Sequence, residues 1–239
     1  MPNPLLTRYL QPLLSGRRNE CFNIIARAIH DGRPAAGLMR EVVWPAMAQM
    51  ERLFRDDRID TVTDNMAARI NRTVADQLQP HLPVRAPNGR RVIVVCADGE
   101  REELGAQLIA DLFQSDGWET FLVGAGVPVD ELLGQIGRIR PDALLVYGAA
   151  PQGAPKVRAL VETIRAIGVC PHMNVIVTGG VFNRADGLWR EVGADIFADS
   201  ADDVLQLANG MKPRDPARAP RTGVVKQRRR KRRAQPQLV

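Results

Sequence analysis

The sequence predicts an all-helical N-terminal region followed by an α/β domain with a parallel β-sheet. Two observations predict this fold class. Apolar residues recur at helical spacing through the first 83 residues. After residue 90, short apolar runs alternate with helical patterns, which is typical of βα units. The chain has 239 residues, enough for one large domain or two small ones.

Residues 1–83 are expected to form a four-helix bundle, because helices of this length must bury their apolar faces together. Breaks are expected at Gly16, at residues 31–34 and at residues 56–58. Pro45 should kink the third helix or mark its start. The last helix should run from about Asp60 to Leu82. Its expected buried stripe consists of Ile59, Val62, Met66, Ile70 and Val74.

Residues 84–90 have the composition of a linker, and residues 91–211 are expected to form the α/β domain. The expected strands are 92–96, 119–123, 143–147, 174–178 and 195–198. The expected helices are 102–116, 130–137, 155–167, 185–192 and 201–210. A flavodoxin-like, Rossmann-like sheet with strand order 2-1-3-4-5 is expected for five such units. Right-handed crossovers then bring the loops after strands one, three and four together.

The first strand, Val92 to Val95, is a continuous apolar run, which indicates burial on both faces of a parallel sheet. It delivers the loop Ala97-Asp98-Gly99-Glu100 to the carboxyl edge of the sheet. Open α/β sheets bind their ligands at this edge. The sequence therefore predicts a small-molecule site around this loop.

Charge is distributed unevenly along the chain. Residues 212–239 contain eleven Lys and Arg residues and one acid, Asp215, so this tail carries a charge of +10. The net charge of the whole chain is +6, so the remaining residues carry −4. The tail's block Arg228 to Arg233 should repel itself and stay disordered. Six consecutive cations can bind nucleic acid or another acidic partner through phosphates, although such an end is more often only solvated.

The remaining composition favours a cytoplasmic protein. Three widely spaced cysteines, Cys21, Cys96 and Cys170, indicate reduced thiols. No apolar segment approaches the roughly 20 residues of a membrane helix, and the N-terminus lacks the pattern of a secretory signal. No nucleophile, base and orienting group can be assembled, so the sequence favours a protein that is not an enzyme.

Three stretches together resemble the cobalamin-binding (vitamin B12-binding) domain family, which includes methionine synthase, corrinoid methyltransferase proteins and light-sensing cobalamin regulators. These are the strand, loop and helix of 92–105, the stretch Val175 to Gly180 with Phe182 and Asn183 after it, and residues 193–201. The helical region in front is similar to the four-helix cap that these families place over the corrinoid. The resemblance covers residues 17–210 and implies a cobalamin cofactor.

The resemblance also implies site residues, several of which depart from the family motifs. Where the family has Asp-x-His-x-x-Gly, with His as the lower cobalt ligand, this chain has Glu100, Glu102 and Gly105 at the motif positions. A carboxylate is a poorer match than imidazole for cobalt in that ligation mode. The sequence therefore offers no metal ligand of its own.

Two other motifs differ as well. The family's Ser-x-Leu, which lines the slot for the nucleotide tail of the cofactor, corresponds to Tyr147, Gly148 and Ala149. A tyrosine ring would crowd that slot. In the cap, Phe54 stands where the light-sensing regulators carry Trp, and Asn65 stands at their His. Phe54 would keep an aromatic lid, but Asn65 cannot supply an imidazole.

Each of these signals has a purely structural alternative. Gly179, Gly180 and Phe182 match the family's turn after strand four. Ordinary strand-to-helix turns also need glycines such as these and Gly105. Glu100 and Glu102 suit the positive end of a helix. Phe54 fits the core stripe of its helix.

The favoured function is a cobalamin-binding sensory or regulatory protein that binds a corrinoid without the usual His ligand or has lost it. The alternatives are a corrinoid carrier subunit of a methyltransferase or mutase system and a nucleic-acid-associated regulator that acts through the basic tail. The expected partners are a corrinoid, a nucleic acid or acidic surface at residues 212–239, and a partner protein or a second copy of the chain, but not a membrane.

Overall fold

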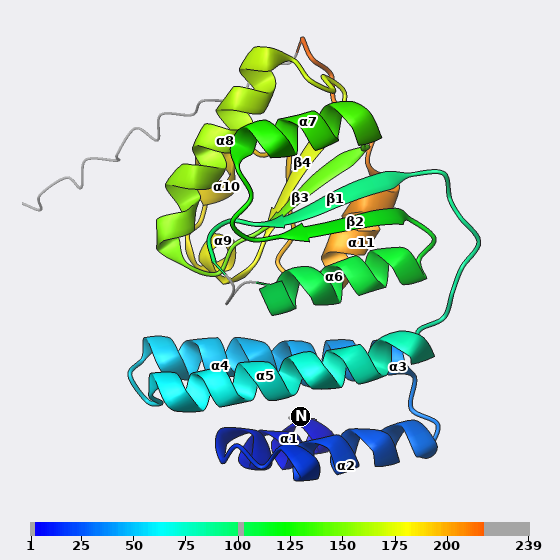
Figure 1. Ribbon diagram of the computed structural model, residues 1–239, viewed down its shortest axis with the longest axis vertical. Coiled ribbons are helices and arrows are strands. Elements are labelled where there is room, and N and C mark those ends of the chain that lie inside the picture. Colours follow the sequence, from blue (N-terminus) through cyan, green and yellow to red (C-terminus); the bar gives the residue numbers. More distant parts are fainter. Residues whose placement is uncertain (1–2, 100–102, 218–239) are drawn as a thin grey trace, which may run out of the picture.

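A computed structural model describes residues 3–99 and 103–217. The expected architecture is confirmed: a helical domain precedes a five-stranded parallel sheet flanked by helices on both faces (Figure 1). The helical domain contains α1 (Pro4–Leu14), α2 (Arg18–His30), α3 (Ala35–Leu38), a π-helical turn (Met39–Val43), α4 (Trp44–Arg55), α5 (Thr61–Leu78) and a 3-10 turn (Gln79–His81).

The α/β domain alternates strands and helices as expected, in the order β2-β1-β3-β4-β5. The strands are β1 (Arg91–Cys96), β2 (Glu119–Gly124), β3 (Ala143–Tyr147), β4 (Asn174–Thr178) and β5 (Ile196–Phe197). The helices are α6 (Glu103–Ser115), α7 (Val129–Ile139), the 3-10 turn Pro151–Gly153, α8 (Ala154–Ile167), α9 (Gly180–Arg184), α10 (Leu188–Glu191) and α11 (Ala201–Gly210). No helix in the described part of the chain has both the length and the hydropathy needed to span a bilayer.

The two faces of the sheet belong to different hydrophobic clusters. Alternating residues such as Ile93, Leu144 and Val175 pack with α7 and α8. The opposite set, including Val94 and Leu145, packs with α6 and α11 and continues into the core of the helical domain. Figure 1 shows α4 and α5 below α6, with α1 and α2 on their far side. The helical domain is therefore stacked on one face of the α/β domain.

The third helix passes through Pro45 without a break in helical backbone. Pro45 lies in the first turn of α4, directly after the π-helical turn. Proline cannot donate a backbone hydrogen bond to the carbonyl four residues before it. The Glu41 carbonyl at that position accepts a hydrogen bond from Nδ2 of Asn3 at 3.3 Å. The expected start at Pro45 therefore appears as a local change of helical pitch.

The predicted stripe of the last helix is partly wrong. Val62 is 63% exposed and Met66 is 40% exposed. The buried face of α5 is instead formed by Ala67, Ile70, Asn71, Val74, Ala75 and Leu78. Small alanines let the neighbouring helices approach closely, and the Asn71 side chain is satisfied by the Tyr9 hydroxyl at 2.8 Å. Apolar character alone thus gave the wrong phase for the first half of this helix.

Two further expectations need correction. A single helix over 185–192 was expected, but α9 begins at Gly180 and ends at Arg184, and α10 follows. The tail was expected to leave the α/β domain at residue 212, but its first residues are bonded to that domain. The Lys212 carbonyl accepts a hydrogen bond from Asn174, and the Arg214 amide donates to the His172 carbonyl. The block 228–233 lies outside the described residues. The division at the linker, residues 84–90, stays a prediction.

Candidate functional site at the carboxyl edge of the sheet

The loops after β1, β3 and β4 meet at the carboxyl edge, as the strand order requires. The Ala97 amide donates to the Tyr147 carbonyl at 2.8 Å, and the Gly148 amide donates to the Thr178 carbonyl at 2.9 Å. The Gly148 carbonyl in turn accepts from the Val181 amide at 3.2 Å. These bonds hold the three loops together as one surface.

Glycine is required where two of these loops touch. Gly179 has φ of +105°, and a Cβ atom there would lie within 3.0 Å of three backbone atoms of Gly148. A Cβ atom on Gly148 would lie 2.9 Å from the Phe182 ring. Phe182 is 2% exposed and belongs to the cluster on the α7 and α8 face. Gly148, Gly179 and Phe182 therefore build the floor of the site.

Tyr147 fills the space between β3 and α6. A Cβ atom on Gly105 would lie within 2.6 Å of three ring atoms of Tyr147, so the ring rests directly against the backbone of α6. Tyr147 is 3% exposed, and the ring of Trp44 meets it edge-on with 6.1 Å between centroids. The sequence predicted that the Tyr147 ring would crowd the slot for the nucleotide tail. In the structure this ring is buried and packed against α6 and Trp44.

The helix α4 covers the floor from the helical domain. Its Glu51 forms an ion pair with Arg184 of α9, and a Cβ atom on Gly180 would lie 2.7 Å from Oε2 of Glu51. Arg184 also donates to the Ala149 carbonyl at 2.7 Å. Tyr147 and Gly180 are therefore both met by one helix of the helical domain, which roofs the carboxyl edge.

The two predicted cap residues lie on α4 and α5 of the helical domain. Phe54 is half-buried and follows Glu51 by three positions on α4, so the two share a helix face. Asn65 is exposed on α5 and precedes Arg72 by seven positions, which places it two turns along the same face. Arg72 reaches the α/β domain, where it pairs with Glu103 at 3.1 Å.

The remaining predicted residues, Glu100 and Glu102, lie outside the described residues. On either side of them, Asp98 pairs with Lys156 of α8, and Glu103 pairs with Arg72 of α5. Among the described residues no cluster of three His, Cys, Asp or Glu side chains could hold a metal ion.

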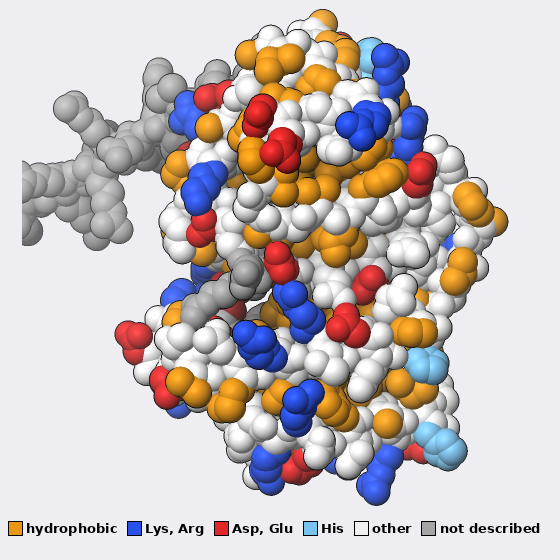
Figure 2. All heavy atoms as spheres, viewed as in Figure 1, with side chains coloured by type: hydrophobic (Ala, Val, Ile, Leu, Met, Phe, Trp, Pro, Cys, Tyr) orange, Lys and Arg blue, Asp and Glu red, His pale blue; other side chains and the backbone are white. Residues whose placement is uncertain are grey.

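Charged side chains line the boundary between the two domains beside the candidate site. Glu51 with Arg184, Arg72 with Glu103, and Arg40 with Asp202 at 2.7 Å all cross from the helical domain to the α/β domain. Figure 2 shows basic and acidic side chains gathered along this boundary, where the surface is indented. A cavity of about 600 Å³ lies at the opposite, amino edge, lined in part by Arg140, Cys170 and His172, and none of the predicted site residues lines it.

Trp44, Glu51 and Arg184 were missed by sequence reasoning. Arg184 is 133 residues from Glu51, and no local pattern pairs them. The one available signal was position, because Arg184 lies four residues after Gly180 in the turn that the family resemblance had singled out. A cross-domain contact of this kind becomes visible only after the two domains are stacked.

The α/β domain matches a known protein family. Residues 90–208 match the family model described as the B12 binding domain. The HTH-type transcriptional repressor CarA of Myxococcus xanthus is 24% identical over 160 residues, which cover 65% of this chain and 52% of CarA. The chain thus spans about half the length of that relative.

Two corrinoid proteins match over more of their length. Dimethylamine corrinoid protein 3 of Methanosarcina acetivorans is 21% identical over 206 residues, covering 85% of this chain and 95% of the relative. The solved structure of the monomethylamine corrinoid protein of Methanosarcina barkeri superposes with a TM-score of 0.76 at 14% identity, covering 85% of this chain and 96% of that one. Residues 90–208 are therefore a B12-binding domain, and through them the chain belongs to the B12-binding domain family.

Proposed function

We propose that this protein binds a corrinoid in the crevice between the carboxyl edge of the sheet and α4, and that it serves a sensory or regulatory role. The observation that carries the proposal is that Tyr147 and Gly180, on neighbouring loops, are both met by α4. A ligand at the usual edge of an open α/β sheet would therefore contact both domains. Membership of the B12-binding domain family supports a corrinoid as that ligand.

The residues present do not fit the nucleotide tail of the cofactor, whose slot the family resemblance places at Tyr147, Gly148 and Ala149. The ring of Tyr147 occupies that space against Gly105. The crevice itself is bridged by the Glu51–Arg184 ion pair, whose side chains are 28% and 34% exposed. A corrinoid would have to part this contact, and its tail would stay outside the slot.

The absence of an imidazole favours regulation over methyl transfer. Position 102, which the resemblance aligns with the lower cobalt ligand, is Glu, and position 65 in the helical domain is Asn. Imidazole is a better match than a carboxylate for cobalt in that mode. Likeness to the repressor CarA supports the same role.

The test is spectroscopic. The purified full-length protein is incubated with hydroxocobalamin, methylcobalamin or adenosylcobalamin and then desalted. We expect a corrinoid spectrum to remain with the protein, with the cofactor's own lower base still bound. Titration calorimetry gives the affinity. Loss of all corrinoid on desalting, together with no heat of binding, would overturn the proposal.

A second candidate is a corrinoid carrier subunit. It is favoured by the match to dimethylamine corrinoid protein 3, which extends over 95% of that protein. A carrier would accept a methyl group when it is mixed with a methylamine substrate and a corrinoid methyltransferase. No transfer in this reconstituted assay, with a corrinoid-loaded protein, would reject this candidate and leave the regulatory one.

Binding of nucleic acid by the basic tail can accompany either function. Six consecutive Lys and Arg residues, 228–233, favour it. The test removes residues 218–239, because Lys212 and Arg214 are bonded to the α/β domain. We expect affinity for duplex DNA or RNA to fall steeply with salt in the full chain and to disappear in the truncated one. Equal affinity of the two chains would reject tail-mediated binding.

A further inference from the structure

The contact between Tyr147 and Gly105 closes a space that a smaller side chain would leave open. Gly105 has no Cβ, so the ring of Tyr147 can lie against the backbone of α6. Any larger residue at position 105 would place its Cβ atom within 2.6 Å of the ring. Trp44 of α4 meets the ring edge-on and limits its movement toward the crevice. Tyr147 is thus held on two sides, by the α/β domain and by the helical domain.

A second observation lies on the next strand. Tyr147 pairs in register with Thr178 at the end of β4, and residues two positions earlier on both strands, Leu145 and Ile176, belong to the α6-facing cluster. Thr178 therefore points to the same face as Tyr147. It is 0% exposed, and its Oγ1 atom has no hydrogen-bond partner among the described residues.

A buried hydroxyl without a partner is unfavourable, and most such groups in proteins are satisfied. Thr178 therefore carries a buried hydroxyl at the position of β4 that pairs with Tyr147, where valine, an apolar side chain of the same shape, would leave no polar group without a partner. The backbone at Gly105 is one wall of the space that the Tyr147 ring fills, and the Thr178 hydroxyl lies on the neighbouring strand.

We propose that Tyr147 determines which corrinoids this protein accepts. Because its ring occupies the space beside Gly105, the nucleotide tail contributes nothing to binding, and recognition rests on the corrin ring and its side chains alone. The protein then binds corrinoids that lack the tail as well as it binds complete cobalamins. This inference rests on the proposed function, corrinoid binding in the crevice.

The test compares hydroxocobalamin with cobinamide, a corrinoid without the nucleotide tail, by titration calorimetry on the full-length protein. For the natural chain we expect the two dissociation constants to agree within about threefold. Tyr147→Ser should open the space and favour hydroxocobalamin by about tenfold or more, with its lower base displaced in the absorbance spectrum. The double variant Tyr147→Ser, Thr178→Val should lose part of that preference.

Tyr147→Phe keeps the ring, so its two dissociation constants should also agree within about threefold. Ile167→Ala, at an exposed position of α8 away from the site, is the control and should behave as the natural chain. A natural chain that prefers hydroxocobalamin over cobinamide by about tenfold or more would overturn the inference and leave corrinoid binding intact. Binding of neither corrinoid would overturn the proposed function and the inference together. The comparison on the natural chain decides the matter even if Tyr147→Ser fails to fold.

Discussion

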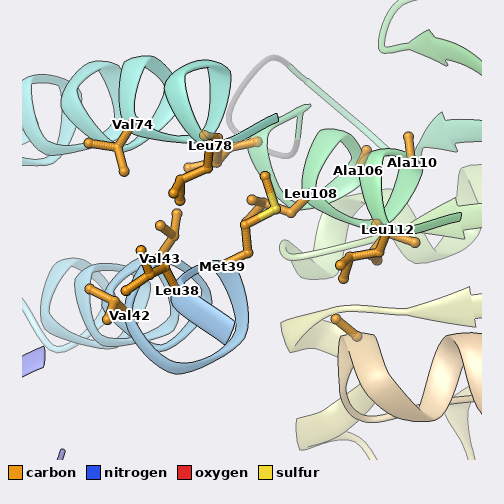
Figure 3. Packing of buried hydrophobic residues seen from close by; sticks show 14 of the residues in the cluster. Leu38, Met39, Val42, Val43, Val74, Leu78, Ala106, Leu108, Ala110 and Leu112 are labelled. Atoms are coloured by element: carbon orange, nitrogen blue, oxygen red, sulfur yellow. The ribbon is translucent and has the colours of Figure 1, made fainter. Parts of the chain in front are cut away.

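The boundary between the helical domain and the α/β domain has two unlike halves. Near the linker it is apolar: Met39 and Leu78 of the helical domain lie close to Leu108 of α6 (Figure 3). At the carboxyl edge it is polar, formed by ion pairs such as Glu51 with Arg184 and Arg72 with Glu103. Half-exposed ion pairs contribute little to stability, typically about 0–1 kcal/mol each.

The linker strengthens the apolar half. The Arg85 amide donates to the Ser115 carbonyl at 3.1 Å, and the Asn88 amide donates to the Gly117 carbonyl at 2.9 Å. The Ser115 hydroxyl donates to the Pro83 carbonyl at 2.6 Å. The domains are therefore fixed at the linker end, while we expect the end that carries the candidate site to separate at low cost in free energy.

The largest effect is expected from breaking the apolar half. Leu108 is 1% exposed and lies in the continuous core. Leu108→Ala should lower the free energy of unfolding by about 2–4 kcal/mol, because it removes buried methyl groups and leaves a cavity. Denaturant unfolding followed by circular dichroism measures this. Leu207→Ala, at a site 43% exposed, is the control and should cost about 0.5 kcal/mol or less. Equal losses for both variants would contradict the proposed importance of this half.

A smaller effect, dependent on pH, is expected at Asp111, on the linker side of Leu108 in α6. Burial, and then the Asp76 carboxylate of α5, raise the pKa of Asp111 on α6 to about 6, and Oδ2 of Asp111 has no hydrogen-bond partner among the described residues. The folded state therefore binds this proton more tightly than the unfolded state. The free energy of unfolding should fall as the pH rises from about 4 to about 6, because protonated Asp111 stabilises the folded state. This contribution is absent at pH 7.

Asp111→Asn should remove this dependence and raise the free energy of unfolding at pH 7 by about 1 kcal/mol, after allowance for the partial exposure of the carboxyl group. Urea unfolding at pH 4.5 and pH 7 measures the change. Asp186→Asn, in an exposed loop, serves as the control and should leave the pH profile as it is. An Asp111→Asn variant that is less stable than the natural chain at pH 7 would refute the assignment.

The smallest effect on stability is expected at the polar half. Glu51→Gln removes the ion pair with Arg184 and should change the free energy of unfolding by about 1 kcal/mol or less. Glu20→Gln, which removes the Arg17–Glu20 surface pair at 3.0 Å, is the matched control. The same Glu51 variant should bind hydroxocobalamin more tightly than the natural chain, since no ion pair must be broken. A loss of stability beyond about 2 kcal/mol would show that this contact is structural.

The sequence was sufficient for the sheet and insufficient for the boundary. Continuous apolar runs such as 92–95 and 143–147 favour central parallel strands, and the short βα connections leave few strand orders. The phase of α5 could not be derived, because Val62 and Met66 are apolar and yet exposed. Small residues decide which face of that helix packs.

The site divides in the same way. Gly148 and Gly179 follow from the turns that parallel strands require, and Tyr147 from its place at the end of β3. Glu51, Trp44 and Arg184 depend on how two domains stack, which is a property of long-range packing and not of any local period. The residues that close the crevice were therefore the ones that the sequence could not supply.

The attachment of Arg214 has a consequence for any second partner. Its guanidinium group contacts the Asp195 carboxylate at 3.2 Å and the Pro171 carbonyl at 3.3 Å, and its amide donates to the His172 carbonyl. The polypeptide is thereby anchored where β4 begins, far from the ends of the strands that α4 covers. A second partner that bound Arg214 itself would have to replace these contacts, and it would meet the protein at the edge of the sheet opposite the one that α4 covers.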